Sequence, residues 1–179
     1  MSAFVLILAA LASRIAALSG WFNFTAVGGS LLFFGARRPL RQAAWALVPF
    51  MAMDVFLTTR VYRMAFHAQD YLITWVWYAA VLVLGSLLLK QQTNVTRVVS
   101  GAVLASTSFF AVSNYAVWVG SGMYPHTLGG LSACYASALP FYRNDIISTL
   151  LVTGAAFGVE ALVRRSREAS AASHGQIAA

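Results

Sequence analysis

Charged residues are scarce in this sequence. Only 9% of its 179 residues are Asp, Glu, Lys or Arg, whereas a soluble domain typically carries about a quarter. With so few charges the chain does not cover its own surface with polar groups, which excludes an ordinary soluble globular protein. Hydrophobic residues make up 60% of the chain, and its mean hydropathy is +0.73. The sequence therefore predicts an all-α polytopic membrane protein whose surface mostly faces lipid.

Cysteine is also scarce, and the usual catalytic and metal-binding spacings are missing. The single cysteine, Cys134, excludes an internal disulfide. It is favoured as a small buried thiol, with coordination of a metal-containing ligand as the alternative. Neither HxxxH nor CxxC occurs, and nothing resembles GxSxG, so we expect no metal site, no cofactor and no enzyme activity. The net charge of +7 does not indicate nucleic-acid binding, because the arginines stand between apolar runs.

Long apolar runs are what the sequence does contain. Six of them predict transmembrane helices, at 3–18, 22–36, 41–58, 70–89, 98–119 and 146–163. The first two are short, so we expect a helical hairpin that barely spans the membrane. It is read as retained rather than as a signal peptide, because no basic segment precedes its apolar core. Residues 1–163 then form one six-helix bundle, and the polar tail 164–179 is expected to be disordered.

The basic residues predict the orientation of this bundle. With both termini inside, eight of the 12 Lys and Arg residues fall in the inner connections and the tail. The other four, Arg14, Arg60, Arg63 and Arg143, fall on the outer side. Since inner loops are enriched in Lys and Arg, we expect both termini to be cytoplasmic.

Residues 113–145, SNYAVWVGSGMYPHTLGGLSACYASALPFYRND, form the most unusual outer segment. Gly and Pro interrupt it too often for one helix, yet it is too apolar for a solvated loop. We expect a structured lid or re-entrant turn over the bundle, where protein or a water-filled cavity satisfies its backbone. Within it, LGGLSACYASALPF predicts a short interfacial helix that stops near Pro140.

Asp54 lies inside the third predicted span, about one helical turn from its outer end. A carboxylate there is costly unless it faces the bundle interior or a partner. Two interpretations are compatible with this position. Asp54 contacts a ligand or cation at the floor of an outward-open cup, or it forms an internal ion pair with Arg14 or Arg60.

Aromatic residues gather near the outer ends of the fourth and fifth spans. They are Trp75, Trp77, Tyr78 and Trp118. Such residues are typical of the aromatic belt at a membrane interface. Stacking on a flat ligand is the alternative.

Small residues recur on one face of the first helix. Ala9, Ala12 and Ala16 are spaced by three and four, so they share that face. A face of small side chains lets another backbone come close. Its partner is either a neighbouring helix of the same chain or a separate membrane protein.

Three elements of the sequence carry a family resemblance. They are RxxxxxxxxNFTxxGG at 14–29, the acid at Asp54, and NYxVWxxxGxYPxTLxGLxxCYxxALPFxRN at 114–144. Together they resemble a widespread family of six-helix bacterial membrane proteins of unknown function. That family is in turn similar, more loosely, to the substrate-binding S-components of energy-coupling-factor (ECF) vitamin transporters.

The resemblance implies a location in the bacterial inner membrane and an outward-facing pocket capped by loops. It also implies a docking patch of AxxxA spacing on the first helix, which Ala12 and Ala16 match. Through this patch an S-component binds a coupling transmembrane subunit that carries ATPases.

The leading hypothesis is therefore a membrane protein that binds and takes up a vitamin-sized molecule. The expected polar contacts to the ligand are Arg14, Asn23, Asp54, Arg63, His126, Tyr135, Arg143 and Asn144. The rival hypothesis is an accessory subunit of a larger membrane complex, with the outer loops as a protein interface.

Overall fold

The computed structural model describes residues 3–20, 23–91 and 93–177, and these residues are mostly helical. No β-strand occurs among them, which confirms the predicted all-α class. In chain order the elements are α1 (Ala3–Ala16), η1 (Ala17–Ser19), α2 (Val27–Arg37), α3 (Leu40–Ala43), η2 (Ala44–Ala46), α4 (Leu47–Phe56), η3 (Leu57–Val61), η4 (Ala68–Tyr71), α5 (Leu72–Leu89), α6 (Val95–Gly120) and α7 (Leu128–Ile177).

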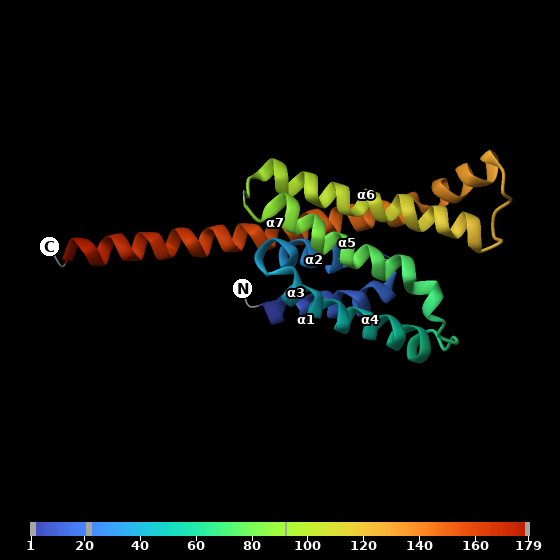
Figure 1. Ribbon diagram of the computed structural model, residues 1–179, viewed down its shortest axis with the longest axis horizontal. Helices are drawn as coiled ribbons and strands as arrows, with labels where there is room; N and C mark the ends of the chain where they lie inside the picture. Colours follow the sequence, from blue (N-terminus) through green and yellow to red (C-terminus); the bar gives the residue numbers. More distant parts are fainter. Residues whose placement is uncertain (1–2, 21–22, 92, 178–179) are drawn as a thin grey trace.

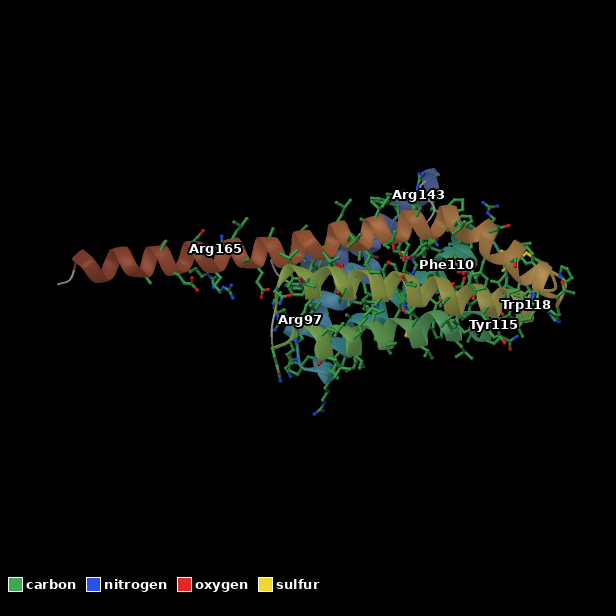
Figure 2. All side chains as sticks on the ribbon, turned by 90° about the horizontal axis from the view of Figure 1, so that it is seen from above. Arg97, Phe110, Tyr115, Trp118, Arg143 and Arg165 are labelled. Carbon is green, nitrogen blue, oxygen red and sulfur yellow. The ribbon has the colours of Figure 1, made fainter. Side chains whose placement is uncertain are left out.

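The elements run side by side, and the chain reverses direction after each pass (Figure 1). The turn at residues 37–40, the end of α5 and the start of α6 lie at the same end as the start of α1, and α7 extends beyond the bundle there (Figure 1). We call this the basic end, because Arg97 and Arg165 lie toward it in Figure 2. The opposite end holds Tyr115 and Trp118, and we call it the aromatic end (Figure 2).

Four passes are long and apolar enough to cross a membrane. They are Leu40–Val61, Ala68–Leu89, Val95–Gly120 and Leu128–Ala171. The other two passes are shorter than the predicted spans: the apolar helix of the first is Val5–Ala16, and α2 has 11 residues. At 1.5 Å per residue α2 is about 16 Å long, half of a hydrocarbon core of ~30 Å. The structure thus supports four full-length spans and two shorter helices in place of the six predicted spans.

The buried centre of the bundle is α2. It starts five residues later than predicted, because residues 23–26 are not helical and Asn23 adopts a positive φ of 60°. Nine of its 11 residues are buried, and it packs mainly against α5 and α7. A short helix suffices here, because protein rather than lipid surrounds it.

Two glycines let α2 and α5 cross in backbone contact. Gly35 on α2 faces the backbone carbonyl of Leu82, and Gly85 on α5 faces the backbone carbonyl of Leu32. A Cβ atom at either position would collide with that carbonyl. Reciprocal small residues of this kind are typical of close helix crossings in membranes.

Apolar side chains cover much of the outside of the bundle. Val76 on α5 is 67% exposed, Leu87 on the same helix is 75% exposed, and Leu151 on α7 is 60% exposed. Exposed apolar surface this extensive is unusual for a soluble monomer and typical of a surface that faces lipid.

The segment expected to form a lid belongs to a helical hairpin instead. α7 begins at Leu128 and continues through Pro140, so the predicted interfacial helix and the sixth span are one helix. Its first turns pack along the end of α6, where the Tyr135 hydroxyl donates to the Ala111 carbonyl at 2.6 Å (Figure 2). Proline removes one backbone hydrogen bond and commonly kinks a helix, but it need not end one that neighbouring side chains support.

The polar tail also differs from its prediction. Residues 164–177 continue α7 as helix, while 178–179 lie outside the described residues. Arg164 and Glu168 stand one turn apart, with 3.9 Å between Arg164 Nε and Glu168 Oε1. An i,i+4 pair of opposite charges and the continuity with the sixth pass favour helix over disorder.

Candidate functional site

A buried ion pair joins α1 to α4 near the aromatic end. Arg14 Nη1 lies 2.6 Å from Asp54 Oδ1, and Asp54 is only 1% exposed. The same guanidinium donates to the Tyr78 hydroxyl of α5 at 2.9 Å. The indole N–H of Trp75, also on α5, donates to Asp54 Oδ2 at 2.9 Å. Asp54 Oδ1 is thus balanced by the guanidinium charge, although it accepts no hydrogen bond of regular geometry among the described residues, and Oδ2 accepts one from the indole.

The end of the third pass continues this network. There α4 gives way to η3, a single turn of π-helix, which is a form frequent at functional sites. Thr58 of η3 donates to the backbone carbonyl of Asp54 at 2.8 Å and hydrogen-bonds the Tyr71 hydroxyl. The rings of Phe66, Tyr71 and Trp75 form a cluster in which each contacts the other two, with centroids 5.3 to 6.1 Å apart. The Trp75 indole that donates to Asp54 is therefore part of an aromatic cluster.

Two small hollows open beside the ion pair. The first, about 190 Å³, is lined by Arg14, Asn23, Thr25, Val27, Gly28, Asp54, Tyr71, Thr74, Trp77, Tyr78, Phe109 and Asp145. The second, also about 190 Å³, is lined by Asn23, Ser106, Phe109, Phe110, Ser113, Asn114, Ala138, Phe141, Tyr142 and Asp145. Asn23, Phe109 and Asp145 line both hollows, so the two are adjacent.

Asp145 is the buried acid between the hollows. It lies on α7 and is 8% exposed. Within the part of the chain that the structure describes, its Oδ2 has no hydrogen-bond partner and no cationic side chain pairs with it. The Ser106 hydroxyl lies beside the Asp145 carboxyl, and the buried Thr149 hydroxyl oxygen has no hydrogen-bond partner among these residues. Asp145 Oδ2 is therefore a buried acceptor that the described side chains leave unused.

A second arginine–carboxylate pair lies at the basic end. Arg37 Nε is 2.7 Å and 2.8 Å from the two carboxylate oxygens of Glu160. The same guanidinium also donates to the Leu89 carbonyl and the Thr93 hydroxyl, and its Cζ lies 4.8 Å from the ring centroid of Phe157. This pair borders an open groove of about 940 Å³ between the start of α6 and the later turns of α7.

The structure brings together three of the eight predicted ligand contacts. Arg14, Asn23 and Asp54 line the first hollow. The other five line neither hollow: Arg63, His126, Tyr135, Arg143 and Asn144. Arg143 is exposed, on the side of α7 away from α6 in Figure 2, and His126 is exposed on the 121–127 turn, where its ring contacts Trp118.

Of the two interpretations of Asp54, the structure contains the internal ion pair. Its partner is Arg14, whereas Arg60 is exposed. A ligand contact stays a prediction, and it is compatible with the pair because Asp54 also lines the first hollow. Cys134 is 2% exposed, with its Sγ 3.4 Å from the Asn114 carbonyl, as expected of a buried thiol.

The sequence predicts Trp75, Trp77 and Tyr78 either as belt aromatics or as residues that stack on a flat ligand, and it does not single out Asp145. Trp77 and Tyr78 are 8% and 4% exposed and lie inside the bundle, which differs from a belt at the membrane interface. Only the packing of the helices shows that Trp77 and Tyr78 lie on the side of α5 that faces the interior of the bundle. Asp145 had one signal, an acid directly before the sixth apolar run.

Metal ligands do not gather in the described ranges 3–20, 23–91 and 93–177. No three His, Cys, Asp or Glu side chains come close enough there to hold an ion.

Fold and site together define a class: an all-helical protein with four helices able to cross a membrane and a buried charged network beside two hollows. The chain belongs to DUF6580, a family of unknown function whose model matches residues 1–172. No curated protein and no solved structure matches the chain.

Proposed function

We propose that this protein is an integral membrane protein that binds a small molecule in the hollows at its aromatic end and takes it up into the cell. One observation carries the proposal: charged and polar side chains from separate passes converge on these hollows. Arg14 comes from α1, Asp54 from α4, Tyr78 from α5 and Asp145 from α7. Side chains this polar are expensive inside a membrane and mark ligand pathways by default.

Orientation is part of the proposal. The basic residues of the 37–41 turn, the 90–97 connection and the later turns of α7 lie at one end, which the positive-inside rule assigns to the cytoplasm. The hollows then open near the outer face of the bacterial inner membrane. This orientation is the one expected from the resemblance of the sequence to ECF S-components, which capture their ligand from outside.

Ligand binding is the direct test. Protein purified in detergent would be screened by thermal shift against vitamins and other small metabolites, and native mass spectrometry would detect a co-purifying compound. We expect at least one compound to raise the melting temperature and to accumulate in proteoliposomes. If neither binding nor a co-purifying compound is found, the proposed function is wrong.

A matched pair of variants locates the site. Asn23→Gly removes a side chain that lines both hollows and tolerates the positive φ of 60° at this position. We expect it to weaken binding. Glu160→Gln alters the opposite end and should leave binding unchanged.

A partner protein is the second part of the proposal. Ala9, Ala12 and Ala16 are exposed on α1 rather than packed against a helix of this chain. This supports a docking face for another membrane protein, either a coupling transmembrane subunit with ATPases or, in the rival proposal, a larger complex in which this chain is an accessory subunit. Cross-linking in membranes from a cysteine placed at Ala12 should capture that partner, and capture of only non-transport subunits would favour the accessory role.

A further inference from the structure

Asp145 gives the hollows their net charge. Three ionisable side chains line the two hollows besides tyrosine: Arg14, Asp54 and Asp145. Arg14 and Asp54 neutralise each other across 2.6 Å, whereas Asp145 has no cationic partner among the described residues. A carboxylate buried without a counter-charge costs several kcal/mol. When Asp145 is ionised, the hollows therefore carry one negative charge that no described side chain balances.

The nearest arginine in sequence does not supply this charge. Arg143 precedes Asp145 by two residues, which places it about 200° around the helix axis. It is exposed and lines neither hollow. No Arg, Lys or His side chain among the described residues therefore pairs with Asp145, and a cationic ligand would supply the counter-charge.

Aromatic rings form much of the remaining wall. Trp77 and Phe109 lie with ring centroids 4.6 Å apart beside the first hollow, and Phe110 and Tyr142 lie at the same separation beside the second. Ring faces attract organic cations, and most strongly where water is excluded. An inorganic cation would instead need several oxygen ligands around it. The Asp145 carboxylate and the aromatic rings around it are thus suited to an organic ammonium ion.

We propose that the ligand of these hollows is a small organic cation, a protonated amine or a quaternary ammonium, whose charge pairs with Asp145. This inference rests on the proposed function and adds the chemical class of its ligand. The Ser106 hydroxyl lines the second hollow beside Asp145 and adds an acceptor for an N–H or O–H of the ligand. Each hollow of about 190 Å³ holds a ligand of roughly six non-hydrogen atoms, judged from a liquid water volume of about 30 Å³.

Matched probes test the charge of the ligand. Choline would be compared with 3,3-dimethyl-1-butanol, and ethanolammonium with 1-propanol, because each pair has one shape and differs by one positive charge. Binding to the full-length protein in nanodiscs would be measured by calorimetry and by tryptophan fluorescence. We expect at least one cation to bind about tenfold or more tighter than its neutral counterpart, as for other charged hydrogen-bonded contacts. Equal affinity within both pairs, or binding of neither pair, overturns the proposal.

Variants locate the charge at Asp145. Asp145→Asn keeps the shape of the side chain and should abolish the preference for the cation. Asp70→Asn makes the same chemical change at an exposed carboxylate on η4 and should preserve it. An Asp145→Asn protein that folds and keeps the preference overturns the proposal. If that variant does not fold, the comparison of charged and neutral probes on the unaltered protein still decides it.

Three further outcomes distinguish a failure of this inference from a failure of the proposed function. A neutral or anionic compound that binds and is lost in Asn23→Gly would leave the uptake function intact and refute the cationic ligand. Stabilisation by Na⁺ in place of both organic cations would also refute it. Failure of every compound in the broad screen would refute the function itself.

Discussion

Arginine and a carboxylate pair at both ends of the bundle, but in opposite surroundings. At the aromatic end, the Asp54 side chain is 1% exposed and that of Arg14 is 19% exposed. At the basic end, the side chains of Arg37 and Glu160 are 24% and 39% exposed, and they border an open groove. An arginine–carboxylate pair is therefore buried at the aromatic end and accessible to solvent at the basic end.

The difference teaches what each pair contributes. A buried pair is weak evidence for stability as such, since desolvation offsets most of the attraction, but losing one partner leaves a stranded charge. An accessible pair gains little and loses little. The pair of Arg14 and Asp54 thus fixes three helices in one arrangement, whereas that of Arg37 and Glu160 is replaceable.

The largest loss of folded protein is expected from a change at the close crossing of α2 and α5. Gly85→Leu places a side chain against the Leu32 carbonyl and forces α2 away from α5. We expect no stable monodisperse protein, measured as recovery in size-exclusion chromatography after detergent extraction. Gly154→Leu is the control, because a Cβ there has no neighbour within 4 Å. Normal recovery of Gly85→Leu would contradict the close crossing.

Asp54→Asn is expected to have the next largest effect. It strands the Arg14 charge at a buried site, which costs about 3–5 kcal/mol in the free energy of unfolding. Detergent-titrated unfolding followed by tryptophan fluorescence measures this loss. The double variant Arg14→Met with Asp54→Leu should recover most of it, since no charge is then left unpaired. A single variant as stable as the unaltered protein would refute the locked pair.

Tyr78→Phe measures how much the hydrogen bond between Arg14 and Tyr78 contributes to stability. The change removes one hydrogen bond to Arg14 while Asp54 remains as its partner. We expect a loss of about 1.5 kcal/mol, the low end for a hydrogen bond to a charged group. The same unfolding titration measures it. A loss as large as that of Asp54→Asn would mean that Tyr78 rather than Asp54 holds the guanidinium.

Glu160→Gln is expected to have the smallest effect. Arg37 keeps the Leu89 carbonyl, the Thr93 hydroxyl and the Phe157 ring as partners. The loss should stay below about 1 kcal/mol, as for other accessible ion pairs. It should also shrink further in high salt, whereas the loss from Asp54→Asn should not. If Glu160→Gln lowered the free energy of unfolding by several kcal/mol at every salt concentration, the two ion pairs would not differ as proposed.

Periodicity and hydropathy predicted the long passes well. The runs 70–89 and 98–119 correspond closely to Ala68–Leu89 and Val95–Gly120. The start of α2 was missed because Asn23 breaks the helix through its backbone conformation, which hydropathy does not register. α7 was divided in two at Pro140 because a proline signals a helix end only when nothing else supports the helix.

Site residues were predictable from the sequence only where burying a charge costs so much free energy that a partner or a ligand is required. A carboxylate within an apolar run demands a partner, so the sequence singled out Asp54 and offered Arg14 or Arg60 as that partner. Tyr and Trp side chains are also common at a membrane interface. The sequence therefore did not indicate that the polar groups of Tyr78 and Trp75 point toward Arg14 and Asp54. Asp145 follows Arg143 in sequence, and only the helical twist shows that the two face different sides.

The 50-residue helix α7 makes the chain a lever. Pro140 lies within its first quarter, and from there to Ala171 the rod runs about 45 Å at 1.5 Å per residue. A tilt of about 5° at the proline would swing the far tip by roughly 4 Å over that length. Spin labels on the part of α7 that protrudes from the bundle would therefore report such a tilt as a displacement at the basic end.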